Sequence, residues 1–144
     1  MKRTLLYIAG CMTLLVAADS CRSVGTTRKT GATDISRLAD ARWRPLVLYG
    51  KTVAEDTEAF ISFATNDLRV GGNSGCNAFT GTCKLTEDGL MQFSQMVFTR
   101  KMCFGANIEE KFSAALDATV RFALSGDTLV FYDDTGSELC RFGK

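Results

Sequence analysis

The chain has 144 residues, a hydrophobic fraction of 46% and a formal net charge of +1. This composition predicts one folded domain, and the absence of a basic cluster argues against a nucleic-acid partner. The sequence has no histidine, which excludes Ser-His-Asp and Cys-His catalysis and most zinc sites. We therefore expect neither a metal ion nor a cofactor.

Residues 1–20 have the pattern of a secretory signal peptide. Lys2 and Arg3 form a short basic start, and a mostly apolar stretch follows over residues 5–18. This stretch is shorter than the about 20 apolar residues that a membrane-spanning helix needs. We therefore expect the protein to be exported and residues 1–20 to be removed.

Cys21 follows small residues at the end of this segment, an arrangement that resembles the lipobox of bacterial lipoproteins. The resemblance implies cleavage before Cys21 and lipid attachment to its thiol, and the lack of an Asp after it points to the outer rather than the inner membrane. Cys11 fits the lipobox better, but it would leave an apolar stretch of only about six residues, below the usual length. Cys21 is therefore the preferred lipidation site, and plain secretion with Cys21 as a free thiol is the alternative.

The segment after Cys21 is rich in Ser, Thr and Gly and has little to bury. Such a composition is typical of a flexible tether. We expect residues 21–40 to be a lipidated N-terminus and linker, and residues 41–144 to form the folded domain.

Short apolar or alternating stretches separated by turn residues predict β-strands. They cover residues 43–50, 59–64, 68–70, 79–85, 90–93 and 96–102, and then residues 122–124, 128–132 and 137–142. Between these groups, Asn107 and Glu110 form a capping-box pattern, and Phe112, Ala115 and Leu116 share a helical face. The expected fold is mainly β, a small antiparallel barrel or curled sheet with one α-helix packed against it.

The stretch GGNSGCNAFTGTC, residues 71–83, admits three interpretations. A phosphate-binding loop needs a Lys and a following helix, and neither is predicted here. A nucleophilic cysteine needs a neighbouring base or cation, and in an oxidising compartment nearby thiols pair instead. We favour a structural corner, because its glycines permit positive φ angles and Asn73 and Asn77 can hydrogen-bond to the nearby backbone.

Several of these residues together resemble the META domain, or HslJ-like, family. The resemblance rests on Gly75-Cys76-Asn77 with Phe79 and Gly81, on Thr99-Arg100-Lys101-Met102-Cys103, and on Trp43, Phe63 and residues 126–129. It implies a bacterial envelope protein, often a lipoprotein, with a compact antiparallel barrel and one helix. The family is linked to heat shock, antibiotic tolerance and virulence, and no agreed molecular activity comes with it.

The resemblance also implies a disulfide between Cys76 and Cys103. Cys83 stands where the family usually has an aromatic residue and Cys140 is also unexpected, so we expect these two to form a second disulfide. Four cysteines allow three connectivities, and the sequence alone leaves the other two open.

Asn77, Thr99 and Arg100 are candidate polar contacts for a ligand. For the Thr99-Arg100 pair we favour a structural role, with a salt bridge to a carboxylate on the sheet, because such ion pairs are common. No residue is expected to be catalytic.

The sequence therefore predicts a non-enzymatic envelope lipoprotein that acts in envelope stress or in binding an envelope protein. Its lipid anchor would be its contact with the membrane. One alternative is a carrier barrel for a small apolar ligand, with Phe side chains deciding whether its interior has room. The other alternative is a thiol redox protein.

Overall fold

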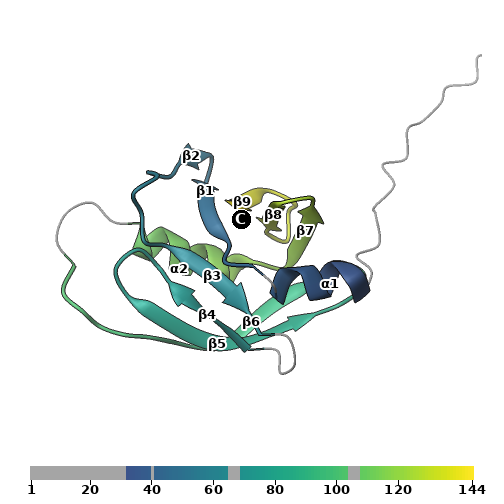
Figure 1. Ribbon diagram of the computed structural model, residues 1–144, viewed down its shortest axis with the longest axis horizontal. Coiled ribbons are helices and arrows are strands. Elements are labelled where there is room, and N and C mark those ends of the chain that lie inside the picture. Colours follow the sequence, from purple (N-terminus) through teal and green to yellow (C-terminus); the bar gives the residue numbers. More distant parts are fainter. Residues whose placement is uncertain (1–31, 40, 65–68, 104–107) are drawn as a thin grey trace, which may run out of the picture.

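The computed structural model describes residues 32–39, 41–64, 69–103 and 108–144 (Figure 1). The expected signal peptide, both candidate lipidation sites, Cys11 and Cys21, and the expected helix cap Asn107 lie outside the described residues. Within the described ranges, no helix is both long and apolar enough to cross a membrane.

Nine strands within the described ranges form two antiparallel sheets, so the expectation of a mainly β fold is confirmed. The five-stranded sheet has the order β2-β1-β9-β8-β7 and contains β1 (Arg44–Leu48), β2 (Lys51–Thr52), β7 (Arg121–Ser125), β8 (Thr128–Tyr132) and β9 (Glu138–Gly143). The four-stranded sheet follows the chain order and contains β3 (Phe60–Phe63), β4 (Arg69–Asn73), β5 (Ala78–Leu85) and β6 (Met91–Phe98).

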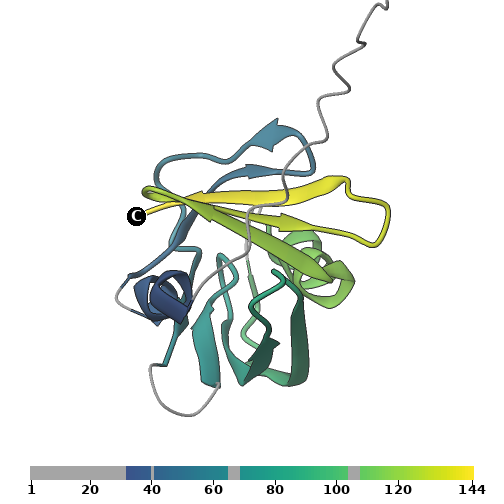
Figure 2. The same cartoon turned by 90° about the vertical axis from the view of Figure 1, so that its right-hand side faces the viewer.

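The two sheets do not close into one barrel within the described residues, which corrects the barrel expectation. They are joined by two isolated bridges, between Trp43 and Ile61 and between Leu90 and Arg121. In Figure 2 the strands of the five-stranded sheet run across the view, whereas those of the four-stranded sheet run up and down. Each bridge is a single residue pair and not part of a continuous ladder.

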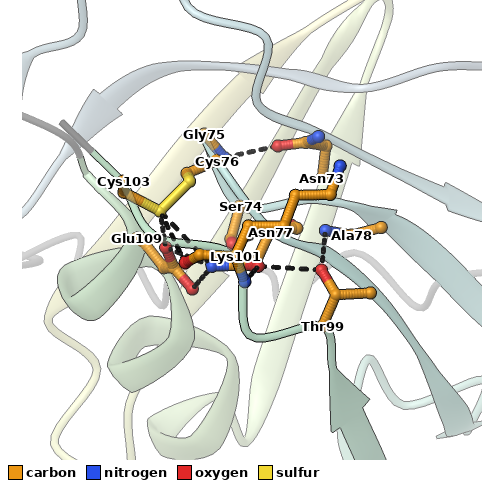
Figure 3. Close-up of a disulfide and its surroundings, with 10 residues drawn as sticks. All are labelled: Asn73, Ser74, Gly75, Cys76, Asn77, Ala78, Thr99, Lys101, Cys103 and Glu109. Carbon is orange, nitrogen blue, oxygen red and sulfur yellow. Dashed lines mark hydrogen bonds between the residues drawn. A yellow bond between two sulfur atoms is a disulfide. The ribbon is translucent and has the colours of Figure 1, made fainter.

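The expected helix is α2 (Glu109–Ala118), and it buries Phe112, Ala115 and Leu116 as its spacing predicted. It packs against β1 and β9 of the five-stranded sheet. This contact places the helix start beside the corner that joins β4 to β5 (Figure 3).

A second helix, α1 (Ala32–Ala39), lies in the segment expected to be a flexible linker. Leu38 is fully buried, and its carbonyl accepts a hydrogen bond of 3.0 Å from the Trp43 indole nitrogen. The linker prediction is therefore wrong for residues 32–39. The segment is dominated by small and polar residues, so its apolar pattern was too weak to reveal this helix.

Aromatic side chains fill the space between the sheets. The rings of Phe93 in β6 and Phe131 in β8 lie 5.6 Å apart, and Phe131 lies 4.8 Å from Phe142 in β9. The Phe112 ring of α2 lies 6.0 Å from that of Phe79 in β5. Both sheets and the helix therefore share one core.

β6 is one strand rather than the two predicted, and it lies at the edge of its sheet. Its pairing with β5 shifts between Thr80 and Thr82, and Gln95 at the shift has a φ of 54°. A β-bulge of this kind adds an unpaired residue and bends the strand. The bulge explains why the alternating pattern is interrupted in the sequence.

Candidate functional site

The motif residues meet at the corner between β4 and β5 (Figure 3). The Ser74 backbone N–H donates to the Asn77 carbonyl at 2.8 Å, and the Gly75 N–H donates to Asn73 Oδ1 at 2.8 Å. Gly75 has a φ of +113°, a conformation that residues with a Cβ rarely adopt. These contacts confirm the interpretation of the glycine-rich stretch as a structural corner.

A disulfide fixes this corner to the segment that precedes α2. It joins Cys76 to Cys103, whose Cα atoms are 6.0 Å apart, so the first expected pairing is confirmed. The two cysteines are 27 residues apart in the chain. In the chain-entropy account, closing a loop of this length stabilises the fold by about 3.5 kcal/mol.

Asn77 is the centre of the polar network at the corner, and it is only 4% exposed. Its Nδ2 donates to the two carboxylate oxygens of Glu109 at 2.7 and 2.9 Å. Its Oδ1 accepts from the Thr99 hydroxyl at 2.8 Å and from the Lys101 backbone N–H at 2.7 Å. The Nδ2 also donates to the Cys103 sulfur at 3.4 Å. Because an amide offers two donor hydrogens and one acceptor oxygen with two lone pairs, the contacts with Glu109, Cys103, Thr99 and Lys101 together use its full capacity.

The other two candidate ligand contacts, Thr99 and Arg100, have different surroundings. The Thr99 hydroxyl also accepts from the Ala78 backbone N–H at 3.1 Å, so Thr99 ties β5 to the end of β6. Arg100 is exposed and forms no ion pair with a described residue, so the expected salt bridge is wrong. Arg100 lies beyond the last residue of β6, Phe98, and the four strands of that sheet contain no Asp or Glu with which it could pair.

The second expected disulfide is also wrong, because Cys83 and Cys140 are free and buried. Cys83 lies in β5 and Cys140 in β9, which belong to different sheets. Facing sheets pack about 10 Å apart, whereas disulfide-bonded Cα atoms are about 4.4–6.8 Å apart. Burial raises the pKa of the Cys83 thiol to about 12 and raises the pKa of Cys140 as well, with a further contribution from Glu138.

Glu109 is the site residue that sequence reasoning missed. The sequence placed it in the first turn of the helix, where a carboxylate suits the helix dipole. Its contact with Asn77 crosses 32 positions of the chain, and no local pattern indicates such a contact.

The ligand atoms of Cys76, Cys103 and Glu109 lie within 4.8 Å of one another. Metal ions bind thiolates, and the two sulfurs are instead bonded to each other. The Cys103 sulfur lies 3.3 Å from a Glu109 oxygen. The disulfide and the hydrogen bonds of Asn77 therefore make this site a cross-linked polar junction between β5, the end of β6 and α2.

The described residues form two antiparallel sheets around an aromatic core. A disulfide and a polar network fix the corner between β4 and β5, and together these features define a small cross-linked β domain. The chain belongs to the META domain family, whose model matches residues 36–144. No curated protein matched the chain.

Two solved structures share this fold. One solution NMR structure is 25% identical, with a TM-score of 0.60, and the match covers 75% of this chain and 92% of the other. Another NMR structure, of a protein from Burkholderia xenovorans, is 17% identical with a TM-score of 0.58, and the match covers 96% of this chain and 99% of the other. This likeness concerns the fold.

Proposed function

We propose that this META domain is exported, is anchored to the outer membrane through a lipid on Cys21, and serves as a non-enzymatic binding module in the envelope stress response. The basic start, the apolar stretch and the lipobox-like cysteine support export and anchoring. The Cys76–Cys103 disulfide agrees with an oxidising compartment. The bound partner would be an envelope protein.

The observation that carries the non-enzymatic part is the hydrogen bonding of Asn77. The amide of this motif residue is fully used by Glu109, Cys103, Thr99 and Lys101. A group that must contact a substrate needs a free donor or acceptor, and Asn77 has neither left. The family motif is therefore best explained as the support of a scaffold that presents other surfaces.

The two alternative functions, a carrier of a small apolar ligand and a thiol redox protein, have less support. An interior carrier site would need space where Phe79, Phe112 and Phe131 are buried at 5% exposure or less. A thiol redox centre would need a cysteine with a lowered pKa, and the two free thiols have raised values.

The anchor is tested by labelling cells with a clickable palmitate analogue. The wild-type protein should carry the label and fractionate with the outer membrane, and Cys21→Ala should lose both properties. Cys11→Ala is the matched control and should keep both. Label on Cys21→Ala, or its loss from Cys11→Ala, would contradict the assignment to Cys21.

The role in stress is tested by complementation of a deletion strain under heat and antibiotic stress. Wild-type protein should restore growth, and Cys21→Ala, which lacks the proposed lipid anchor, should restore it poorly. Asn77→Asp should keep part of the function in proportion to its folded fraction, because the proposal gives Asn77 no chemical step. Complete loss of function in a folded Asn77 variant would contradict the non-enzymatic proposal.

A further inference from the structure

A charged groove of about 430 Å³ lies beside the disulfide-linked corner, outside the polar network of Asn77. Arg42 and Arg44 form part of its wall. Both side chains are exposed, whereas Trp43 between them is buried, so the arginines project from the same side of an extended segment. The guanidinium carbon of Arg42 lies 3.9 Å from the centroid of the Phe60 ring, which fixes its position by a cation–π contact.

Carboxylates form another part of the same wall. Glu55, Asp56 and Glu58 line the groove and are all exposed. Their loop is held by a backbone hydrogen bond of 3.2 Å from the Thr57 N–H to the Ala54 carbonyl. The groove therefore presents cationic and anionic groups from two separate segments of the chain.

None of these five charged side chains forms an ion pair with a described residue. The salt bridges among the described residues lie elsewhere, between Arg141 and Glu138 and between Lys144 and Asp127. The groove also contains Asn73, whose Oδ1 is used by Gly75 while its Nδ2 forms no hydrogen bond to a described residue. Guanidinium groups and an amide N–H₂ are donors that suit a phosphate, and carboxylates suit an ammonium group.

An apolar hollow of about 360 Å³ continues from the charged groove. The two share Arg44, Glu55 and Thr57 in their linings. The hollow is otherwise lined mainly by Pro45, Leu46, Val53 and Ala54, and Leu46 is 49% exposed. A ligand that fills both spaces must have a head with charges of both signs next to an apolar part.

We infer that this groove and hollow bind an ethanolamine phospholipid. Arg42 and Arg44 take the phosphate, the carboxylates of the 55–58 loop take the primary ammonium, and the hollow takes the first part of an acyl chain. The volumes fall in the range of small-molecule sites, about 300–1,000 Å³.

The charges of the groove also predict which lipids it rejects. A choline head has no N–H to donate, and its usual receptor is an aromatic cage. The aromatic ring in this groove, Phe60, is already covered by Arg42. An anionic glycerol head has no positive charge for Glu55, Asp56 and Glu58, so these carboxylates repel it.

The test uses the fragment 32–144, which contains every described element and the whole buried core from Leu38 to Phe142. This fragment lacks Cys21, so the result does not depend on the proposed lipid anchor, and a failure leaves the anchor proposal standing. Flotation is measured with vesicles of phosphatidylcholine alone, and of phosphatidylcholine mixed equally with phosphatidylethanolamine or with phosphatidylglycerol. Thermal unfolding of each variant verifies that it is folded.

We expect the fragment to bind the ethanolamine vesicles at least about tenfold more tightly than either other type, a difference typical of one good polar contact. Arg42→Gln with Arg44→Gln should abolish this preference, and Lys111→Gln with Arg121→Gln, the matched charge control, should keep it. Replacing Glu55, Asp56 and Glu58 by their amides should remove the discrimination against phosphatidylglycerol. Soluble O-phosphoethanolamine should compete only weakly, because it lacks the apolar part.

Equal binding to ethanolamine and choline vesicles would overturn the inference, as would unchanged binding by the arginine variant. Binding to phosphatidylglycerol alone would identify nonspecific attraction to anionic surfaces. Competition by O-phosphoethanolamine at the same concentration as the lipid would show that the hollow plays no part. A Lys-Glu peptide that displaces the fragment from vesicles more effectively than O-phosphoethanolamine would assign the groove to a peptide ligand instead.

Discussion

Replacing Asn77 by Ala tests the role of the polar network most directly. The change leaves the Glu109 carboxylate and the Lys101 N–H without the partners that now lie 2.7 Å away. A hydrogen bond to a charged group contributes about 1.5–3 kcal/mol, and an unpaired buried group costs about 1–3 kcal/mol. Because Glu109 is only partly buried and can regain water, we expect a loss of about 3 kcal/mol in the free energy of unfolding.

Urea unfolding of the fragment 32–144 with its disulfide intact measures this loss. Asn73→Ala is the matched control, because Asn73 lies in the same corner and its Oδ1 accepts from Gly75. It should cost about 1 kcal/mol. In a double-mutant cycle, Asn77→Ala and Glu109→Ala should show a coupling of at least about 1 kcal/mol. Equal costs for the two asparagines, or full additivity of Asn77 and Glu109, would refute the reasoning.

Three further predictions concern other parts of the fold. In the native fragment, Cys83 and Cys140 should not react with Ellman's reagent at pH 8 within minutes, because burial raises the pKa of both thiols. Both thiols should react when the fragment is unfolded in guanidinium. Rapid labelling of the native protein would contradict their burial. Hydrogen bonds from Thr135 and Ser137 lower the pKa of Asp133, so its stabilisation is present above the unfolded value of about 3.9 and is lost as the pH falls through the folded value. Urea unfolding should therefore show Asp133→Asn less stable than wild type at about pH 6, with the difference shrinking as the pH falls through the folded pKa of Asp133. A difference that stays constant with pH would be inconsistent with this linkage. Gly72→Ala should lower the free energy of unfolding by about 3 kcal/mol, because a Cβ at this position collides with the Phe60 backbone carbonyl. Gly126→Ala has open space around it and should cost about 1 kcal/mol through backbone strain alone. Equal costs in thermal unfolding would contradict the close approach of β3 and β4.

The spacing of apolar residues in the sequence correctly predicted most of the strands and the helix α2. The alternation of apolar residues located most strands, including β8 (Thr128–Tyr132) at its observed bounds. Helical spacing identified the buried face of α2 at Phe112, Ala115 and Leu116. These elements bury one face against a core, and burial of one face is what sequence periodicity records.

Features that depend on the arrangement of distant segments were missed or wrong. The short strand β2 has two exposed residues and no apolar pattern. The pairing of Cys83 with Cys140 failed because sequence does not show that their strands belong to different sheets. The contact between Asn77 and Glu109, like the groove lined by both Arg42 and the 55–58 loop, joins segments whose proximity is not visible in the sequence.

The bulge at Gln95 has a consequence for how copies of this domain behave when they are crowded. An edge strand offers unpaired N–H and C=O groups to any other extended chain, and a long regular edge promotes aggregation. The left-handed residue at Gln95 bends β6 and interrupts its regular hydrogen-bonding pattern, so an incoming strand cannot stay in register along its whole length. Straightening this strand, for example by deleting Gln95, would turn the edge into a template for self-association.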